Sequence, residues 1–197
     1  VLEQRNDYVA QKQHRIEELK AAIDKPGPGD KFDLFVRISR EYEKFVYDSA
    51  SVYIRKLQQN ASQSGDPARI AYARTRRGFI LLSSGMFNEA LDTLLTIRQT
   101  GLPDSIQREY YSVLARTYFD LVDFNNDDYF TSRYTKIGVS YLDSALAHAS
   151  PNSVPYYSLA IMRNVRTGNY KQAEEESLHV LTAFKLTYPE LAIAANT

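Results

Sequence analysis

The sequence contains no cysteine and no tryptophan, and its 24 basic and 24 acidic side chains cancel. Without cysteine the chain has no disulfide framework, no thiolate zinc site and no cysteine nucleophile. The zero net charge argues against a dedicated binder of nucleic acid or of anionic membranes. No run approaches the roughly 18 consecutive apolar residues that a membrane span needs. In contrast, 15 tyrosines and 9 phenylalanines among 197 residues can supply a sizeable core or a binding surface.

The clearest structural signal lies in residues 78–90. Gly78 stands inside an apolar segment, where glycine costs about 1 kcal/mol relative to alanine, so we expect it to permit the close approach of a neighbouring helix. Gly85 fits the left-handed residue that ends many helices. Phe87 and Ala90 then begin a second apolar stripe with helical spacing. The segment therefore predicts two paired helices.

Helical spacing continues along the rest of the chain, and no stretch alternates with the period of two that marks a strand. We expect an all-α fold with an N-terminal capping helix at residues 1–24. Four helical hairpins should follow at residues 31–65, 67–102, 104–150 and 153–187, and a truncated further helix should begin at residues 189–197. Residues 123–132 are rich in aspartate and asparagine, and we expect them to form an insert in the third hairpin.

The repeated hairpins resemble tetratricopeptide repeats. The second helix of each hairpin has a small residue, and these residues recur at intervals typical of stacked helical hairpins. The small residues are Ala50, Ala90, Gly138 and Ala173. The best match to the repeat pattern is the set Gly78, Gly85, Phe87, Ala90 and Pro103, and the last hairpin matches at Gly168, Tyr170 and Ala173. The resemblance implies a right-handed α–α superhelix.

Residues 8–20 and 47–50 are also similar to the N-terminal region of a Bacteroidetes family of tetratricopeptide-like, membrane-linked regulators. This resemblance implies the sensing or interaction domain of a signalling or transcriptional regulator. It also implies a periplasmic or other extracytoplasmic domain of a membrane-anchored protein, with a cytoplasmic location as the alternative.

The resemblance to tetratricopeptide repeats also implies a binding groove, because the first helix of each tetratricopeptide hairpin lines the concave side. Aromatic and arginine side chains are frequent binding hot spots, and such a groove suits an extended or helical peptide. Taken one at a time, we favour packing between helices over a hot-spot role for each aromatic residue. The groove residues carried over are Phe35, Tyr42, Tyr72, Phe79, Arg116, Phe119, Met162 and Arg166.

The sequence contains a group of arginines that could bind a ligand and three histidines that could bind a metal, and we favour a structural role for both. For the arginines, Arg74, Arg76 and Arg77 with Arg108 and Arg116, ion pairs are favoured over a ligand clamp. For the histidines, His14, His148 and His179, surface or capping roles are favoured over metal binding, because they lie far apart in the sequence.

A third pattern, Asp123, Asn125 and Asp127, is similar to the start of a calcium loop. However, Asp128 stands where such a loop requires glycine, and Tyr134 stands where it requires glutamate. We therefore favour a solvated loop, with an incidental divalent ion as the alternative.

No Ser/His/Asp set, paired-carboxylate motif or glycine-rich phosphate loop occurs in the sequence. We expect no catalytic residue, no cofactor and no metal. The leading hypothesis is a non-enzymatic scaffold that binds protein or peptide, without a nucleic-acid partner. Homodimerisation through the N-terminal helix or the open C-terminal edge is a further option. The alternative hypothesis is a cell-envelope protein that binds a glycan or small molecule through its tyrosine-rich surface.

Overall fold

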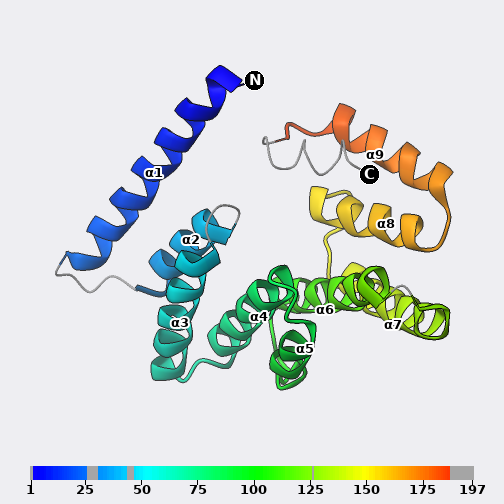
Figure 1. Ribbon diagram of the computed structural model, residues 1–197, viewed down its shortest axis with the longest axis horizontal. Coiled ribbons are helices and arrows are strands. Elements are labelled where there is room, and N and C mark those ends of the chain that lie inside the picture. Colours follow the sequence, from blue (N-terminus) through cyan, green and yellow to red (C-terminus); the bar gives the residue numbers. More distant parts are fainter. Residues whose placement is uncertain (1, 26–30, 44–46, 126, 187–197) are drawn as a thin grey trace. The chain divides into compact units, whose positions relative to one another are not determined.

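The computed structural model describes residues 2–25, 31–43, 47–125 and 127–186. Within these residues it contains nine helices and no strand, which confirms the all-α prediction (Figure 1). None of these helices is long and apolar enough to cross a membrane. The chain divides into two compact units, residues 1–93 and 94–197.

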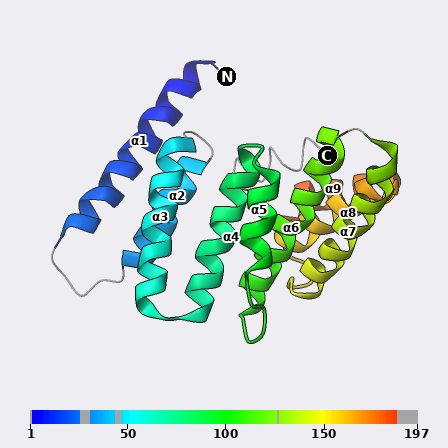
Figure 2. The same ribbon diagram turned by 60° about the horizontal axis from the view of Figure 1, so that its bottom comes forward.

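The first unit contains α1 (Leu2–Asp24), α2 (Lys31–Glu43), α3 (Tyr47–Ser64), α4 (Pro67–Ser83) and most of α5 (Phe87–Leu95). Helix α2 packs against α1 and α3, and α3 packs against α4. Figure 2 shows α2 and α3 side by side. The apolar residues of α2 recur three and four apart, so they share one face and are buried together. Ile16 and Leu19 of α1 join the same core, as expected of a helix that covers the first hairpin.

Helix α4 begins and ends as its sequence predicts. The Asp66 side chain accepts a hydrogen bond of 2.8 Å from the Ala68 amide, and Pro67 occupies the first turn. Gly85 follows the helix with a φ of +75°, in the left-handed region where glycine has no steric penalty. Gly78 and Ala90 are both buried, as the prediction of paired helices requires.

The second unit contains α6 (Asp104–Asn125), α7 (Asp128–Ala147), α8 (Val154–Arg166) and α9 (Tyr170–Ala183). Helix α6 packs along α7, and α8 packs against α7 and α9. At Gly138 of α7 the Phe119 ring of α6 occupies the space of a side chain, because a Cβ atom built there would lie 2.5 Å from Cε1 of Phe119. Glycine at this position therefore allows the two helices to nest.

The prediction that residues 123–132 form an insert is wrong. Helix α6 continues to Asn125 and α7 begins at Asp128. The run of aspartates begins a helix here instead of forming a loop, because Asp127 is the N-cap of α7. Its Oδ1 accepts hydrogen bonds from the amides of Tyr129 and Phe130, at 2.8 and 3.3 Å.

Two other differences concern helix ends and faces. Helix α5 ends at Leu95, seven residues before the end of the hairpin expected at residues 67–102, and the Leu95 side chain is exposed. Leu178 and Leu181 of α9 are also exposed, although their helical spacing predicts burial. The further helix expected at residues 189–197 lies outside the described residues.

Candidate functional site

The four predicted groove residues of the first unit pack into or against its core. Phe35 and Tyr42 are themselves buried members of the core of α1 to α4. Tyr72 and Phe79 of α4 pack against the same core and are partly buried. Since each of these aromatic residues contacts the core, its packing role is established by the structure.

The other four predicted groove residues lie in the second unit, on α6 and α8. Arg116 is exposed on α6, whereas Phe119 is 1% exposed. Met162 of α8 packs against the core that contains Phe119. The guanidinium carbon of Arg166 lies 4.7 Å from the centroid of the Phe119 ring. The structure therefore brings these four residues to adjoining positions on two helices.

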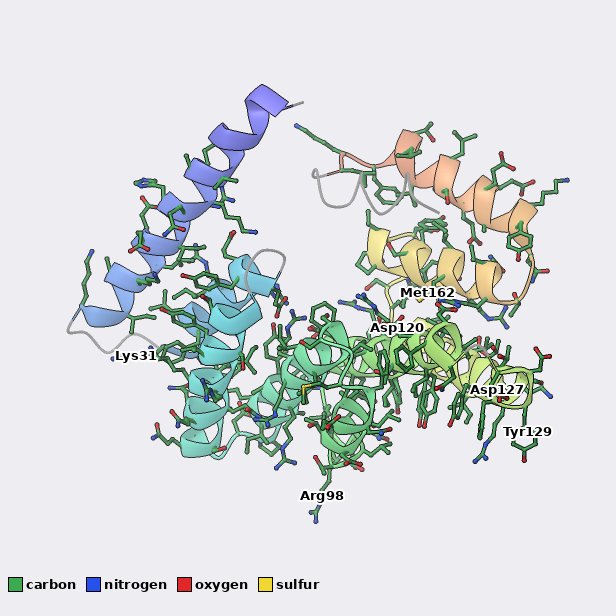
Figure 3. The ribbon with its side chains drawn as sticks, viewed as in Figure 1. Lys31, Arg98, Asp120, Asp127, Tyr129 and Met162 are labelled. Atoms are coloured by element: carbon green, nitrogen blue, oxygen red, sulfur yellow. The ribbon has the colours of Figure 1, made fainter. Side chains whose placement is uncertain are left out.

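Two acidic residues of α6 give this region its electrostatic character, and their carboxyl groups are perturbed in opposite directions. Arg166 donates two hydrogen bonds to Asp123, of 2.9 and 2.8 Å, and these hydrogen bonds lower the pKa of Asp123. Burial raises the pKa of Asp120, and the Arg116 guanidinium, 3.6 Å away, opposes that shift. Figure 3 labels Asp120 of α6 and Met162 of α8.

A small cavity of about 230 Å³ lies between α6 and α8. Its wall combines apolar and polar side chains, namely Arg108, Glu109, Ser112, Pro155, Ser158 and Leu159. Ser158 donates a hydrogen bond of 2.9 Å to the carbonyl oxygen of Val154. Among the described residues, neither Arg108 nor Ser112 has a side-chain hydrogen bond or ion pair.

The cavity and the Arg116–Arg166 region lie on the same faces of α6 and α8. Arg108, Ser112 and Arg116 are four residues apart on α6, and residues with that spacing share a helix face. Ser158, Met162 and Arg166 have the same spacing on α8. We call this surface the α6–α8 face. The four-residue spacing of Arg108, Ser112 and Arg116 is visible in the sequence, but the cavity is not, because it depends on α8 lying beside α6.

A larger depression of about 450 Å³ lies between α1 and α2 in the first unit. Most of its lining side chains are charged, including Arg15, Arg37 and Glu41. Arg15 is paired with Glu41, with 3.4 Å between Nε and Oε1. This depression is larger than the cavity of the α6–α8 face, and two of its charged lining side chains, Arg15 and Glu41, satisfy each other.

The arginines of α4 have the structural partners that we favoured. Arg76 forms a nearly buried ion pair with Glu43 of α2, with a hydrogen bond of 3.0 Å from Nε to Oε1 and a second from Nη2 to Oε2. Arg77 donates a hydrogen bond of 3.2 Å to Gln58 of α3. These two side chains therefore join helices within the first unit.

The histidines lie apart, and each contacts neighbouring side chains. The Nδ1 atom of His148 lies 2.8 Å from Oδ1 of Asp104, and His148 also stacks on Tyr111. His179 packs on Tyr157, and His14 lies 3.3 Å from Glu18. In the part of the chain that the structure describes, no three histidine, aspartate or glutamate side chains form a group suited to a metal ion.

These features define a class of protein. Stacked antiparallel helical hairpins with a buried small residue in the second helix, joined by left-handed glycines, are those of a tetratricopeptide-repeat domain, which is a protein-interaction scaffold. A model of the family described as the SusR N-terminal TPR domain matches residues 2–197, and the chain belongs to this family. Comparison with curated proteins and with solved structures gave no match.

Proposed function

We propose that the chain is a non-enzymatic scaffold that binds a peptide segment of a partner protein on the α6–α8 face. The observation that carries this proposal is the cavity in which the side chains of Arg108 and Ser112 have no partner among the described residues. A backbone carbonyl or a carboxylate of a bound peptide would accept hydrogen bonds from both side chains.

The energetics favour such an acceptor. Arg108 is partly buried in the cavity wall, and its side chain has no protein partner among the described residues that a bound acceptor would have to displace. A hydrogen bond to a charged group contributes about 1.5–3 kcal/mol, roughly twice that of a neutral one. Leu159 and Pro155 offer apolar contact beside these donors. The cavity therefore combines a donor pair with an apolar wall, which suits one side chain of a peptide and its adjacent backbone.

The size of the cavity also favours a peptide. Sites for whole small molecules have volumes of about 300–1,000 Å³, whereas this cavity has about 230 Å³. It is large enough for one or two side chains. A peptide that fills it would continue along Arg116, Met162 and Arg166, which share the same face.

The alternative, a glycan or small-molecule site, has some support from the depression between α1 and α2, which is in the right size range. Its mostly charged lining is unlike the apolar lining of such sites. The tyrosine-rich surface gives this alternative less support, because many of its rings stack on one another and have few faces left for a sugar. We therefore keep the peptide scaffold as the proposed function.

We further propose that this scaffold is the extracytoplasmic sensing or interaction domain of a membrane-anchored regulator, which membership of the SusR domain family supports. The absence of cysteine provides a test. Arg98→Cys in the full-length protein, with any cysteine outside these 197 residues replaced by serine, should react in intact cells with a membrane-impermeant maleimide. Labelling only after the cells are lysed would place the domain in the cytoplasm.

Peptide binding is tested by selecting 12-residue peptides on the wild-type chain and measuring their affinity by calorimetry. Arg108→Ala should weaken the selected peptides at least tenfold. Arg98→Ala is the matched control, because Arg98 is exposed, has no side-chain partner in the described part of the chain, and projects into solvent (Figure 3). Equal affinities for the wild type and Arg108→Ala would contradict the proposal.

A further inference from the structure

A second surface, separate from the α6–α8 face, runs along the α6–α7 hairpin. Five aromatic side chains and one histidine, contributed by both helices, follow one another in a continuous row. Successive ring centroids lie 5.5, 5.9, 5.8, 6.2 and 5.8 Å apart. We call this the aromatic row, and its members in order are Phe130, Tyr134, Tyr118, Tyr141, Tyr111 and His148.

The row arises from a seven-residue spacing on both helices. Tyr111 and Tyr118 are seven residues apart on α6, and Tyr134 and Tyr141 are seven residues apart on α7. Seven residues are nearly two helical turns, so each pair lies along one face of its helix. Because α6 and α7 pack along each other, the two pairs interleave.

The middle of the row has hydroxyl groups that the protein does not use. Tyr118, Tyr134 and Tyr141 are half-buried, and their hydroxyls make no hydrogen bond with any described residue. Tyr110 and Tyr111, by contrast, are hydrogen-bonded to Gln99. Burial raises the pKa of Tyr118, with smaller contributions from Tyr141 and Tyr134, while Arg133 opposes the shift. These hydroxyls therefore lie near one another on a partly dehydrated surface, with a guanidinium beside them.

One end of the row is open to solvent. Tyr129 is 78% exposed and stacks edge-on against Phe130, which is 36% exposed. Phe124, at the end of α6, is 73% exposed. Figure 3 shows Tyr129 beside Asp127 at the start of α7, projecting from the helix. Exposed aromatic side chains at the end of an ordered aromatic surface are typical of an interaction site.

We propose that the aromatic row binds a proline-rich segment of a partner protein in the polyproline II conformation. Most ring faces in the row are covered by neighbouring rings, so a ligand meets ring edges and hydroxyl groups. A polyproline II segment has solvated carbonyl oxygens and no internal hydrogen bonds, and proline has no N–H to leave unpaired. The carbonyls would accept hydrogen bonds from Tyr118, Tyr134 and Tyr141, while the proline rings contact the ring edges.

Conformational entropy and length support this ligand over a flexible peptide. Proline-rich segments are already close to their bound conformation, so binding them orders little. The row extends from Phe130 on α7 to His148, the C-cap of that helix, which at 1.5 Å per residue is about 27 Å. A polyproline II segment of nine or ten residues spans about 28–31 Å. A ten-residue probe therefore covers the row.

The test measures the binding of fluorescein-labelled decaproline to the 197-residue chain by fluorescence anisotropy. The wild type should bind decaproline and not a ten-residue Gly-Ser peptide. The triple variant Tyr118→Phe/Tyr134→Phe/Tyr141→Phe keeps the rings and removes the hydroxyls, and it should bind at least tenfold more weakly. Tyr170→Phe, an exposed tyrosine on α9, is the matched control and should bind as the wild type does.

Several results would overturn the proposal. The first is that the wild type does not bind decaproline at millimolar concentration. The second is that the triple variant binds decaproline as tightly as the wild type does. The third is that the wild type binds a linear hexasaccharide but not decaproline, and that the triple variant loses the hexasaccharide binding. If the triple variant does not fold, Tyr134→Phe alone should weaken binding about threefold or more, and an unchanged affinity would count against the proposal. Arg108→Ala should not affect decaproline binding, so this test is independent of the proposed peptide site.

Discussion

Replacing Gly138 with alanine tests the packing of α6 against α7. The added Cβ would lie 2.5, 2.8 and 2.9 Å from Cε1, Cζ and Cδ1 of Phe119. The Phe119 ring is buried and also carries the Arg166 guanidinium, so it has little freedom to move away. Overpacking of this kind costs about 1–3 kcal/mol. Alanine gains about 1 kcal/mol over glycine in helix propensity. We expect a net loss of up to about 2 kcal/mol.

The assay is chemical and thermal unfolding followed by circular dichroism. For a chain of this size, about 1 kcal/mol corresponds to roughly 2–4 °C in melting temperature, so Gly138→Ala should lower it by up to about 8 °C. Ser140→Ala is the control, because Ser140 is exposed on the same helix. It should change the free energy of unfolding by no more than about 0.5 kcal/mol.

A double-mutant cycle isolates the contact with Phe119. Phe119→Leu makes room at this site, so Gly138→Ala should cost at least about 0.5 kcal/mol less in that background than in the wild type. If the two substitutions are additive, or if Gly138→Ala alone stabilises the protein, the close approach of the two helices is refuted.

The remaining predictions concern charged side chains. Arg166 lowers the pKa of Asp123 in the folded protein, so this carboxylate stabilises the fold above its unfolded pKa of about 3.9, and the contribution is lost as the pH falls through the folded pKa. Asp123→Asn should cost less than about 1 kcal/mol at pH 7, because the pair is half-exposed, and nothing at pH 2. The pKa shift of Asp120 has the opposite sign, because burial raises its pKa in the folded protein. Its contribution to the free energy of unfolding is therefore present at low pH and is lost as the pH rises. Asp120→Asn should therefore be neutral or stabilising at pH 7 in urea titrations, and a loss larger than that of Asp123→Asn would contradict the assignment. Arg76→Met should cost about 3–5 kcal/mol, because it breaks a nearly buried ion pair, and Glu43→Leu in the same chain should restore much of that loss.

The helices and their turns were predictable because their signals are local. Gly85 and Gly168 end helices in the left-handed conformation, and Asp66 with Pro67 begins one. These residues need only their immediate neighbours to adopt their conformation. The error at residues 123–132 has a local cause too, because aspartate favours loops and helix N-caps alike. Composition alone did not distinguish the two.

The surfaces were less predictable because they depend on which helices adjoin. Helical spacing places Phe119 on the same side of α6 as Arg116, but contact with Gly138 and Arg166 makes it a core residue. A substitution of Phe119 would therefore confuse loss of binding with loss of stability, and Arg108 is the better position for a binding test. The tyrosines of the aromatic row have a visible seven-residue spacing, but only the packing of α6 on α7 brings them together.

The exposed leucines show a further limit of periodicity. Leu178 and Leu181 have the spacing of a buried stripe, yet they are exposed on α9. Periodicity identifies an apolar face but does not identify what covers it. In the second unit, the face of α9 that packs on α8 is formed instead around Ala173 and Val180, which are buried.

The proposed function is tested most directly by nuclear magnetic resonance of the ¹⁵N-labelled chain titrated with a selected 12-residue peptide. Binding on the α6–α8 face predicts the largest amide shift changes at Ser112, Ser158 and Leu159, with smaller changes towards Arg116 and Arg166. At a peptide concentration equal to the wild-type Kd, these changes should be at least fivefold smaller in Arg108→Ala. Shift changes confined to the first unit or to α9, with Ser112 and Ser158 unaffected, would contradict the account.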